Sequence, residues 1–157
     1  MNLRSDTLER KEIQVEVFLK EIIERLKPIA DLRDIIINFN NASEHTIEAD
    51  PVLLERAISN LIDNSLKYAP EESSIEITTV NENDTLQISV LDHGPGFANA
   101  DVDELFTRFK RGDATAGTIG SGLGLTIARD VVVAHGGNVL LSNVEGGGAC
   151  ATISLPG

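Results

Sequence analysis

The chain has 157 residues, of which 41% are hydrophobic and 24% are charged, and its formal net charge is −12. This length and composition are typical of one soluble globular domain with its own core, and they exclude disordered and collagen-like chains. The negative charge also argues against a general nucleic-acid binder, because it would repel a phosphate backbone.

The sequence contains neither a predicted membrane span nor a secretion signal. Its longest apolar runs, such as residues 131–134, fall far short of the roughly 20 residues that a span needs. Residues 1–13 are strongly charged and lack the apolar stretch of a signal peptide. Cys150 is the only cysteine, which suits a reducing compartment. We therefore expect a cytoplasmic chain that makes no membrane contact.

The N-terminal part of the chain is predicted to lead into a helix. Residues 1–12 are expected to be a linker or the stub of an upstream dimerisation helix, and residues 13–157 to form one domain. Apolar residues recur at helical spacing from Phe18 to Ala30, which predicts an amphipathic helix.

Two short strands and a second helix are expected next. Residues 35–40 and 45–48 are predicted to be strands around an Asn-Asn turn. Asp50 and Pro51 then provide a helix start, with the helix running to about Tyr68.

A hairpin is predicted in the middle of the chain. Residues 74–80 and 85–92 are rich in β-branched residues. The intervening Asn-Glu-Asn-Asp, at 81–84, is a good turn sequence. We therefore expect two antiparallel neighbours here.

The C-terminal part is predicted to hold a third helix and two final strands. The helix extends from about residue 121 to 135 and ends at a glycine pair, Gly136 and Gly137. Residues 138–143 and 149–155 are strands around a glycine-rich turn. The mixed order of elements predicts an α/β two-layer sandwich, in which a mixed sheet of about five strands is covered on one face by three helices.

The second predicted helix carries a polar stripe. Asn60, Asn64 and Lys67 are four and three residues apart, which places them on one face, where they can act on one ligand. The opposite face is apolar and consists of Leu54, Ile58, Leu61, Ile62 and Ala69. A solvated helix face is the alternative interpretation, although two asparagines one turn apart are poor helix formers and call for a reason.

Two glycine-containing segments and a basic cluster complete the pattern. Asp92, at the end of a predicted strand, precedes Gly94 and Gly96, which permit a tight turn beneath a ligand. Residues 120–125, Gly-Ser-Gly-Leu-Gly-Leu, open the third helix, and free amides at a helix start are a typical phosphate site. Residues 105–112 combine two phenylalanines with three basic residues, which in so acidic a chain suggests a phosphate contact.

These four elements, in this order, resemble the N box, first glycine box, F box and second glycine box of histidine kinases. Histidine kinases share an ATPase superfamily with gyrase, a heat-shock chaperone and mismatch-repair proteins. The resemblance extends from about Ile13 to Pro156, and residues 146–148 look like the last glycine box. It implies a Bergerat-type ATP-binding fold that binds ATP with Mg²⁺.

The resemblance assigns the adenine pocket to residues of three segments. Asp92 would bind the exocyclic amino group of adenine, Gly94 and Gly96 would shape the pocket, and Tyr68 would pack against the base. GTP presents a carbonyl group at that position, so the resemblance implies a preference for ATP.

The resemblance also assigns the metal and phosphate contacts. Asn64 would ligate Mg²⁺ with Asn60 beside it, while Lys67 would meet a phosphate and Arg111 would lie near the γ-phosphate. Oxygen ligands of this kind suit a hard cation. The phosphates would be lined by Gly120, Gly122, Leu123 and Gly124, and residues 110–121 would form a lid.

Asn60 distinguishes this chain from the gyrase-like hydrolases, in which a glutamate at this position activates water. An amide cannot act as a general base, so hydrolysis should be slow and the γ-phosphate kept for an acceptor. The histidines at 45, 93 and 135 lack the acceptor motif of the family. The resemblance therefore implies a histidine kinase catalytic domain that cannot phosphorylate itself without a separate hairpin for dimerisation and histidine phosphotransfer.

The resemblance also implies partners for the parent protein, which would be anchored in the inner membrane and signal to a response regulator. Two alternatives remain open. One is a serine-directed anti-sigma-factor kinase of the same superfamily, although such kinases tend to carry the glutamate that is Asn60 here. The other is a module that senses nucleotide and transfers no phosphate.

Overall fold

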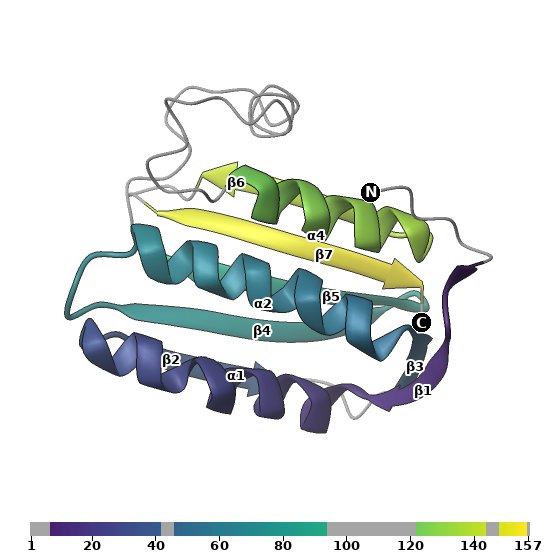
Figure 1. Cartoon of the computed structure of the whole chain (residues 1–157), viewed down its shortest axis with the longest axis horizontal. Coiled ribbons are helices and arrows are strands. Elements are labelled where there is room, and N and C mark those ends of the chain that lie inside the picture. The colour runs from purple at the N-terminus through teal and green to yellow at the C-terminus, as the bar shows by residue number, and fades with distance from the viewer. Residues whose placement is uncertain (1–6, 42–45, 94–121, 144–147, 157) are drawn as a thin grey trace.

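The computed structural model describes residues 7–41, 46–93, 122–143 and 148–156 (Figure 1). The helices of this part of the chain are α1 (Val15–Leu32), α2 (Pro51–Tyr68) and α4 (Gly122–Ala134). The strands are β1 (Lys11–Gln14), β2 (Ile36–Asn41), β3 (Thr46–Ala49), β4 (Ser74–Glu82), β5 (Thr85–Asp92), β6 (Asn138–Asn143) and β7 (Ala149–Pro156).

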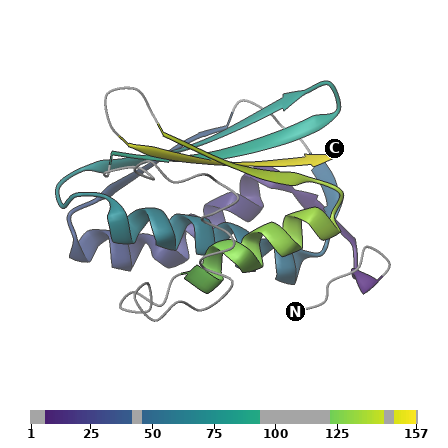
Figure 2. The same cartoon turned by 90° about the horizontal axis from the view of Figure 1, so that it is seen from above.

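The main sheet confirms the predicted fold class. Its five strands lie in the order β2-β4-β5-β7-β6. The β2–β4 pair is parallel and the other three pairs are antiparallel, so the sheet is mixed. Figure 2 shows α1, α2 and α4 together on one side of this sheet. The structure is therefore a two-layer α/β sandwich.

The predicted strands on either side of the Asn-Asn turn are present, but they do not pair with each other. β2 joins the main sheet beside β4, whereas β3 pairs antiparallel with β1 in a separate two-stranded sheet. β1 was not predicted as a strand, and it begins at Lys11, within the expected linker. Ile13 of β1 and Ile47 of β3 are register partners and both are buried, so the burial of this apolar pair accounts for the pairing.

The core lies between the helices and the inner face of the main sheet. In α1, Val15, Leu19 and Ile22 are buried at helical spacing. The predicted apolar face of α2 is confirmed, because all of its members are at most 1% exposed: Leu54, Ile58, Leu61, Ile62 and Ala69. The inward residues of the central strands complete the core, among them Ile75, Ile77, Ile88, Val90 and Ile153. The core buries one face of α2, and this burial determines which α2 side chains point away from the core.

The local signals for turns and helix starts are also confirmed. Asp50 is the N-cap of α2, where its side chain accepts hydrogen bonds from the amides of Val52 and Leu53 at 3.1 and 3.2 Å. In the β4–β5 turn, Asn83 and Asp84 have φ angles of 54° and 58°. These left-handed conformations suit Asn and Asp better than other non-glycine residues.

Candidate functional site

The polar stripe of α2 lies on the face opposite the core. Asn60 and Asn64 are half-buried and Lys67 is exposed, which agrees with a face directed away from the core. The ammonium group of Lys67 lies 3.3 Å from the Asp63 carboxylate, and both side chains are 39% exposed. Lys67 is thus already paired with an acid of the same helix, and a phosphate group that binds Lys67 must compete with Asp63.

Arg33 holds the C-terminal turn of α2. Its guanidinium donates hydrogen bonds to the carbonyl oxygens of Leu66 and Ala69, the latter at 2.7 Å. Carbonyl groups at a helix C-terminus have no partner within the helix, and a cation there also interacts favourably with the helix dipole. The turn that carries Lys67 and Tyr68 is therefore fixed from outside the helix. No local signal in the sequence indicates this role of Arg33, because its partners are 33 and 36 residues away.

Asp92 is buried at the C-terminal end of β5, with 3% of its surface exposed. Its register partner is Ala149, the first residue of β7. Gly148 precedes that residue with a φ of +124°, and a Cβ there would lie 2.4 Å from the Asp92 carbonyl oxygen. A side chain at 148 would therefore clash with the backbone of Asp92. Glycine at this position permits β7 to approach the strand end that carries the carboxylate.

The start of α4 lies at the same end of the molecule as Asp92 and the C-terminal part of α2. Figure 1 shows α4 running antiparallel to α2, so its first turn is beside the last turns of α2. Gly122, Leu123 and Gly124 lie within that first turn. The structure thus brings together three predicted parts of the site: the α2 stripe, the end of β5 and the start of α4.

Several predicted site residues lie outside the described residues. These are Gly94, Gly96, Arg111 and Gly120, together with the basic cluster at 105–112 and the lid at 110–121. The part of the site that the structure describes therefore consists of residues from α2, β5, α4 and the start of β7.

The polar side chains of α2 offer oxygen ligands that suit Mg²⁺. Within the described ranges, no group of three or more His, Cys, Asp and Glu side chains could hold a metal ion. Asn60 and Asn64, one helical turn apart, offer amide oxygens, which are hard ligands. Two neutral oxygens suit a cation that takes most of its other ligands from phosphate and water, so these residues fit Mg²⁺ bound together with a nucleotide.

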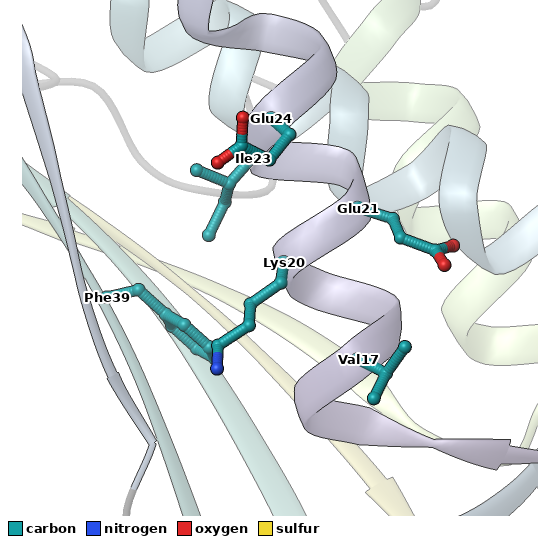
Figure 3. Close-up of a pocket in the computed structure, with 6 residues that line it drawn as sticks. All are labelled: Val17, Lys20, Glu21, Ile23, Glu24 and Phe39. Atoms are coloured by element: carbon teal, nitrogen blue, oxygen red, sulfur yellow. The ribbon is translucent and has the colours of Figure 1, made fainter.

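A separate groove lies between α1 and β2, with a volume of about 640 Å³. Figure 3 shows Lys20 of α1 reaching toward the ring of Phe39 on β2. The residues that line the groove are Val17, Lys20, Glu21, Ile23, Glu24 and Phe39. All belong to α1 or β2, so this groove is distinct from the site formed by α2, β5 and α4.

Comparison with known proteins agrees with this arrangement of elements. Residues 49–157 match the family described as histidine kinase-, DNA gyrase B-, and HSP90-like ATPase. The chain belongs to this family. The matched region includes α2, the end of β5 and α4, and therefore every predicted site residue of this chain. Among the helices that the structure describes, none is long and apolar enough to cross a membrane.

Relatives of this chain include sensor kinases. The sensor-like histidine kinase SenX3 of Mycobacterium tuberculosis (strain CDC 1551 / Oshkosh) is 34% identical over 147 residues, which cover 92% of this chain and 36% of SenX3. The sensor histidine kinase WalK of Bacillus subtilis (strain 168) is 35% identical over 151 residues, which cover 94% of this chain and 25% of WalK. The chain thus spans about a third or less of the length of these relatives.

Solved structures share the fold, among them a histidine kinase catalytic domain. The catalytic domain of histidine kinase ThkA superposes with a TM-score of 0.84 at 24% identity, covering 95% of this chain and 96% of that one. Full-length ShkA in complex with AMPPNP has a TM-score of 0.81 at 28% identity, covering 95% of this chain and 31% of ShkA. The fold of this chain is therefore that of a histidine kinase catalytic domain.

Proposed function

We propose that this chain is the ATP-binding catalytic domain of a sensor histidine kinase, which transfers the γ-phosphate of ATP to a histidine on a helical hairpin. The observation that carries the proposal is the position of Asp92. It is a buried carboxylate at a strand end, beside a helix start rich in glycine and a helix bearing two asparagines and a lysine. The similarity to sensor histidine kinases, and the AMPPNP in the ShkA complex, support the same function.

Each part of the site has a chemical role in this proposal. The Asp92 carboxylate accepts a hydrogen bond from the adenine amino group, and burial strengthens it because water competes less. Asn64, with Asn60 beside it, would hold Mg²⁺, which when bound neutralises phosphate charge. Lys67 meets a phosphate oxygen, and the first amides of α4 are suited to others because they have no partner within the helix.

Substitution of Asp92 tests nucleotide recognition. A hydrogen bond to a charged group is worth about 1.5–3 kcal/mol, so Asp92→Ala should weaken Mg·ATP binding roughly ten- to a hundredfold. Asp92→Asn keeps the shape of the side chain and should also lose affinity. GTP should bind the parent poorly because it presents a carbonyl group in place of the amino group. Equal affinities for ATP and GTP in calorimetry would contradict the role of Asp92.

Transfer of phosphate tests the kinase assignment. The chain incubated alone with labelled ATP should gain no acid-labile phosphate, because none of its histidines has the acceptor motif. An added helical hairpin from the parent protein should become labelled on its histidine. Stoichiometric phosphohistidine on the chain itself would contradict the proposal, and ATP binding without transfer to the hairpin would favour a nucleotide-sensing module.

The proposal extends to the parent protein. The parent protein would signal to a response regulator and be anchored in the inner membrane, with this domain in the cytoplasm. Asn60 supports kinase over hydrolase activity, because its amide cannot activate water as a general base. The γ-phosphate is then kept for the histidine.

A further inference from the structure

His135 is a buried histidine for which the proposed phosphate transfer has no use. It follows the last residue of α4 and is 3% exposed. Its Nε2 accepts a hydrogen bond from the backbone amide of Asp50 at 3.0 Å, across 85 positions of sequence. Because Nε2 accepts, the ring proton is on Nδ1, which donates to the Val131 carbonyl oxygen at 2.7 Å. Both ring nitrogens are thus used in holding the end of α4.

Asp50 has a partner for each of its polar groups. One carboxylate oxygen caps α2, and the other accepts the amide of Glu9 at 3.1 Å. Its carbonyl oxygen accepts the amide of Leu54 at 2.9 Å. Asp50 is itself only 8% exposed. The start of α2, the end of α4 and the segment before β1 therefore meet at one buried residue.

We infer that Asp50 and His135 are positioning residues that fix α4 against α2 and so set the geometry of the nucleotide site at the other end of both helices. We call this contact the Asp50–His135 joint. The inference rests on the proposed function, because it takes the first turn of α4 and the polar stripe of α2 as parts of one nucleotide site. Neither residue touches the nucleotide.

Because α4 is long, a small tilt at its His135 end produces a large displacement of its first turn. A helix of 13 residues is about 20 Å long at a rise of about 1.5 Å per residue. A tilt of about 5° at the His135 end would therefore move the first turn by roughly 1.7 Å. Hydrogen bonds tolerate a range of only about 0.5 Å in donor–acceptor distance. A small displacement at the Asp50–His135 joint would thus break the contacts between the first turn of α4 and the phosphates.

Apolar packing alone fixes this orientation poorly. The side of α4 that faces the core includes Leu125, Ala128, Val131 and Val132, all of which are buried. Hydrophobic contacts are non-directional, so they specify the orientation of α4 against α2 less sharply than a hydrogen bond does. The directed bond between Asp50 and His135 selects one orientation from those that the apolar contacts allow.

Three variants test the joint. His135→Phe keeps a planar ring and removes both nitrogens, whereas His135→Gln keeps an acceptor at similar reach. Ile22→Val removes one buried methylene group from α1, outside the site, and serves as a control for general loss of stability. The melting temperature of each variant is measured first, so that affinities are compared where every variant is folded.

Amide hydrogen exchange without nucleotide is the primary measurement, and Mg·ADP affinity by calorimetry is the second. His135→Phe should speed exchange across residues 126–128, away from the substitution, and weaken Mg·ADP binding about three- to tenfold. His135→Gln should stay nearer the parent, and Ile22→Val should change neither. A merely structural role would lower the melting temperature of His135→Phe while leaving the affinity of the folded protein at the parental value.

The inference is overturned if exchange in His135→Phe rises only next to residues 50 and 135 while Mg·ADP affinity is parental. It is also overturned if Ile22→Val reproduces both effects. A parent chain that binds no Mg·ADP would refute the proposed function, and the exchange measurement would still decide whether the joint positions α4. An NMR coupling across the hydrogen bond from Asp50 N to His135 Nε2 tests the parent without any substitution, and its absence would refute the joint.

Discussion

Gly148→Ala is expected to damage both stability and nucleotide binding. The new Cβ would lie 2.4 Å from the Asp92 carbonyl oxygen, whereas real Cβ atoms require 3.0 Å and fit comfortably from 3.4 Å. The ends of β5 and β7 must therefore separate by about 0.6–1.0 Å, an overpacking that costs about 1–3 kcal/mol. The φ of +124° adds about 1–3 kcal/mol of backbone strain. The total, about 2–6 kcal/mol, is a large part of a typical domain stability.

The same displacement should also weaken nucleotide binding, because it moves Asp92 at the end of β5. A shift of about 0.6–1.0 Å exceeds the range over which a hydrogen bond keeps its strength, so Mg·ATP affinity should fall by about tenfold or more. Thermal unfolding should show a Tm lower by roughly 5–20 °C. Calorimetry on the folded protein then measures the change in affinity separately from the loss of stability.

Asn83→Ala is the control for backbone strain. Asn83 also has a positive φ, 54°. It lies in the β4–β5 turn, at the opposite end of β5 from Asp92, and is not part of the Asp50–His135 joint. This variant should lose about 1–2 kcal/mol and keep the parental affinity. Parental Mg·ATP affinity in folded Gly148→Ala would refute the reasoning that links this glycine to the nucleotide through Asp92.

Two further substitutions test the phosphate contacts. Asp63→Asn removes the acid paired with Lys67, and since exposed ion pairs are worth about 0.2–1 kcal/mol, Mg·ATP should bind up to about fivefold more tightly. Asp84→Asn makes the same change of charge at the β4–β5 turn, and an equal gain in calorimetry there would show that net charge alone is responsible. Arg111→Ala, outside the described residues, should spare ADP affinity and slow transfer to the hairpin about ten- to a thousandfold. A rate within twofold of the parent would contradict this role, and recovery at higher hairpin concentration would assign Arg111 to docking.

The sequence by itself determined the elements whose signals are local. The spacing of Asn60, Asn64 and Lys67 predicted one polar face of α2, because a helical period of 3.6 residues depends on near neighbours alone. The Asp-Pro helix start and the turn at 81–84 were predicted for the same reason. Asp92 was singled out because it ends a strand and precedes two glycines. The resemblance to histidine kinases then joined these separate signals into one nucleotide site.

The tertiary structure decided which distant segments meet. β2 and β3 are neighbours in sequence, yet they join different sheets, because strand pairing depends on which apolar faces are buried together. The clash that requires glycine at 148 appears only when β7 lies beside Asp92. In the same way, nothing near His135 in the sequence indicates that its ring binds the amide of Asp50. Contacts across 85 residues leave no periodic pattern in the sequence, and they exist because packing places the end of one helix against the start of another.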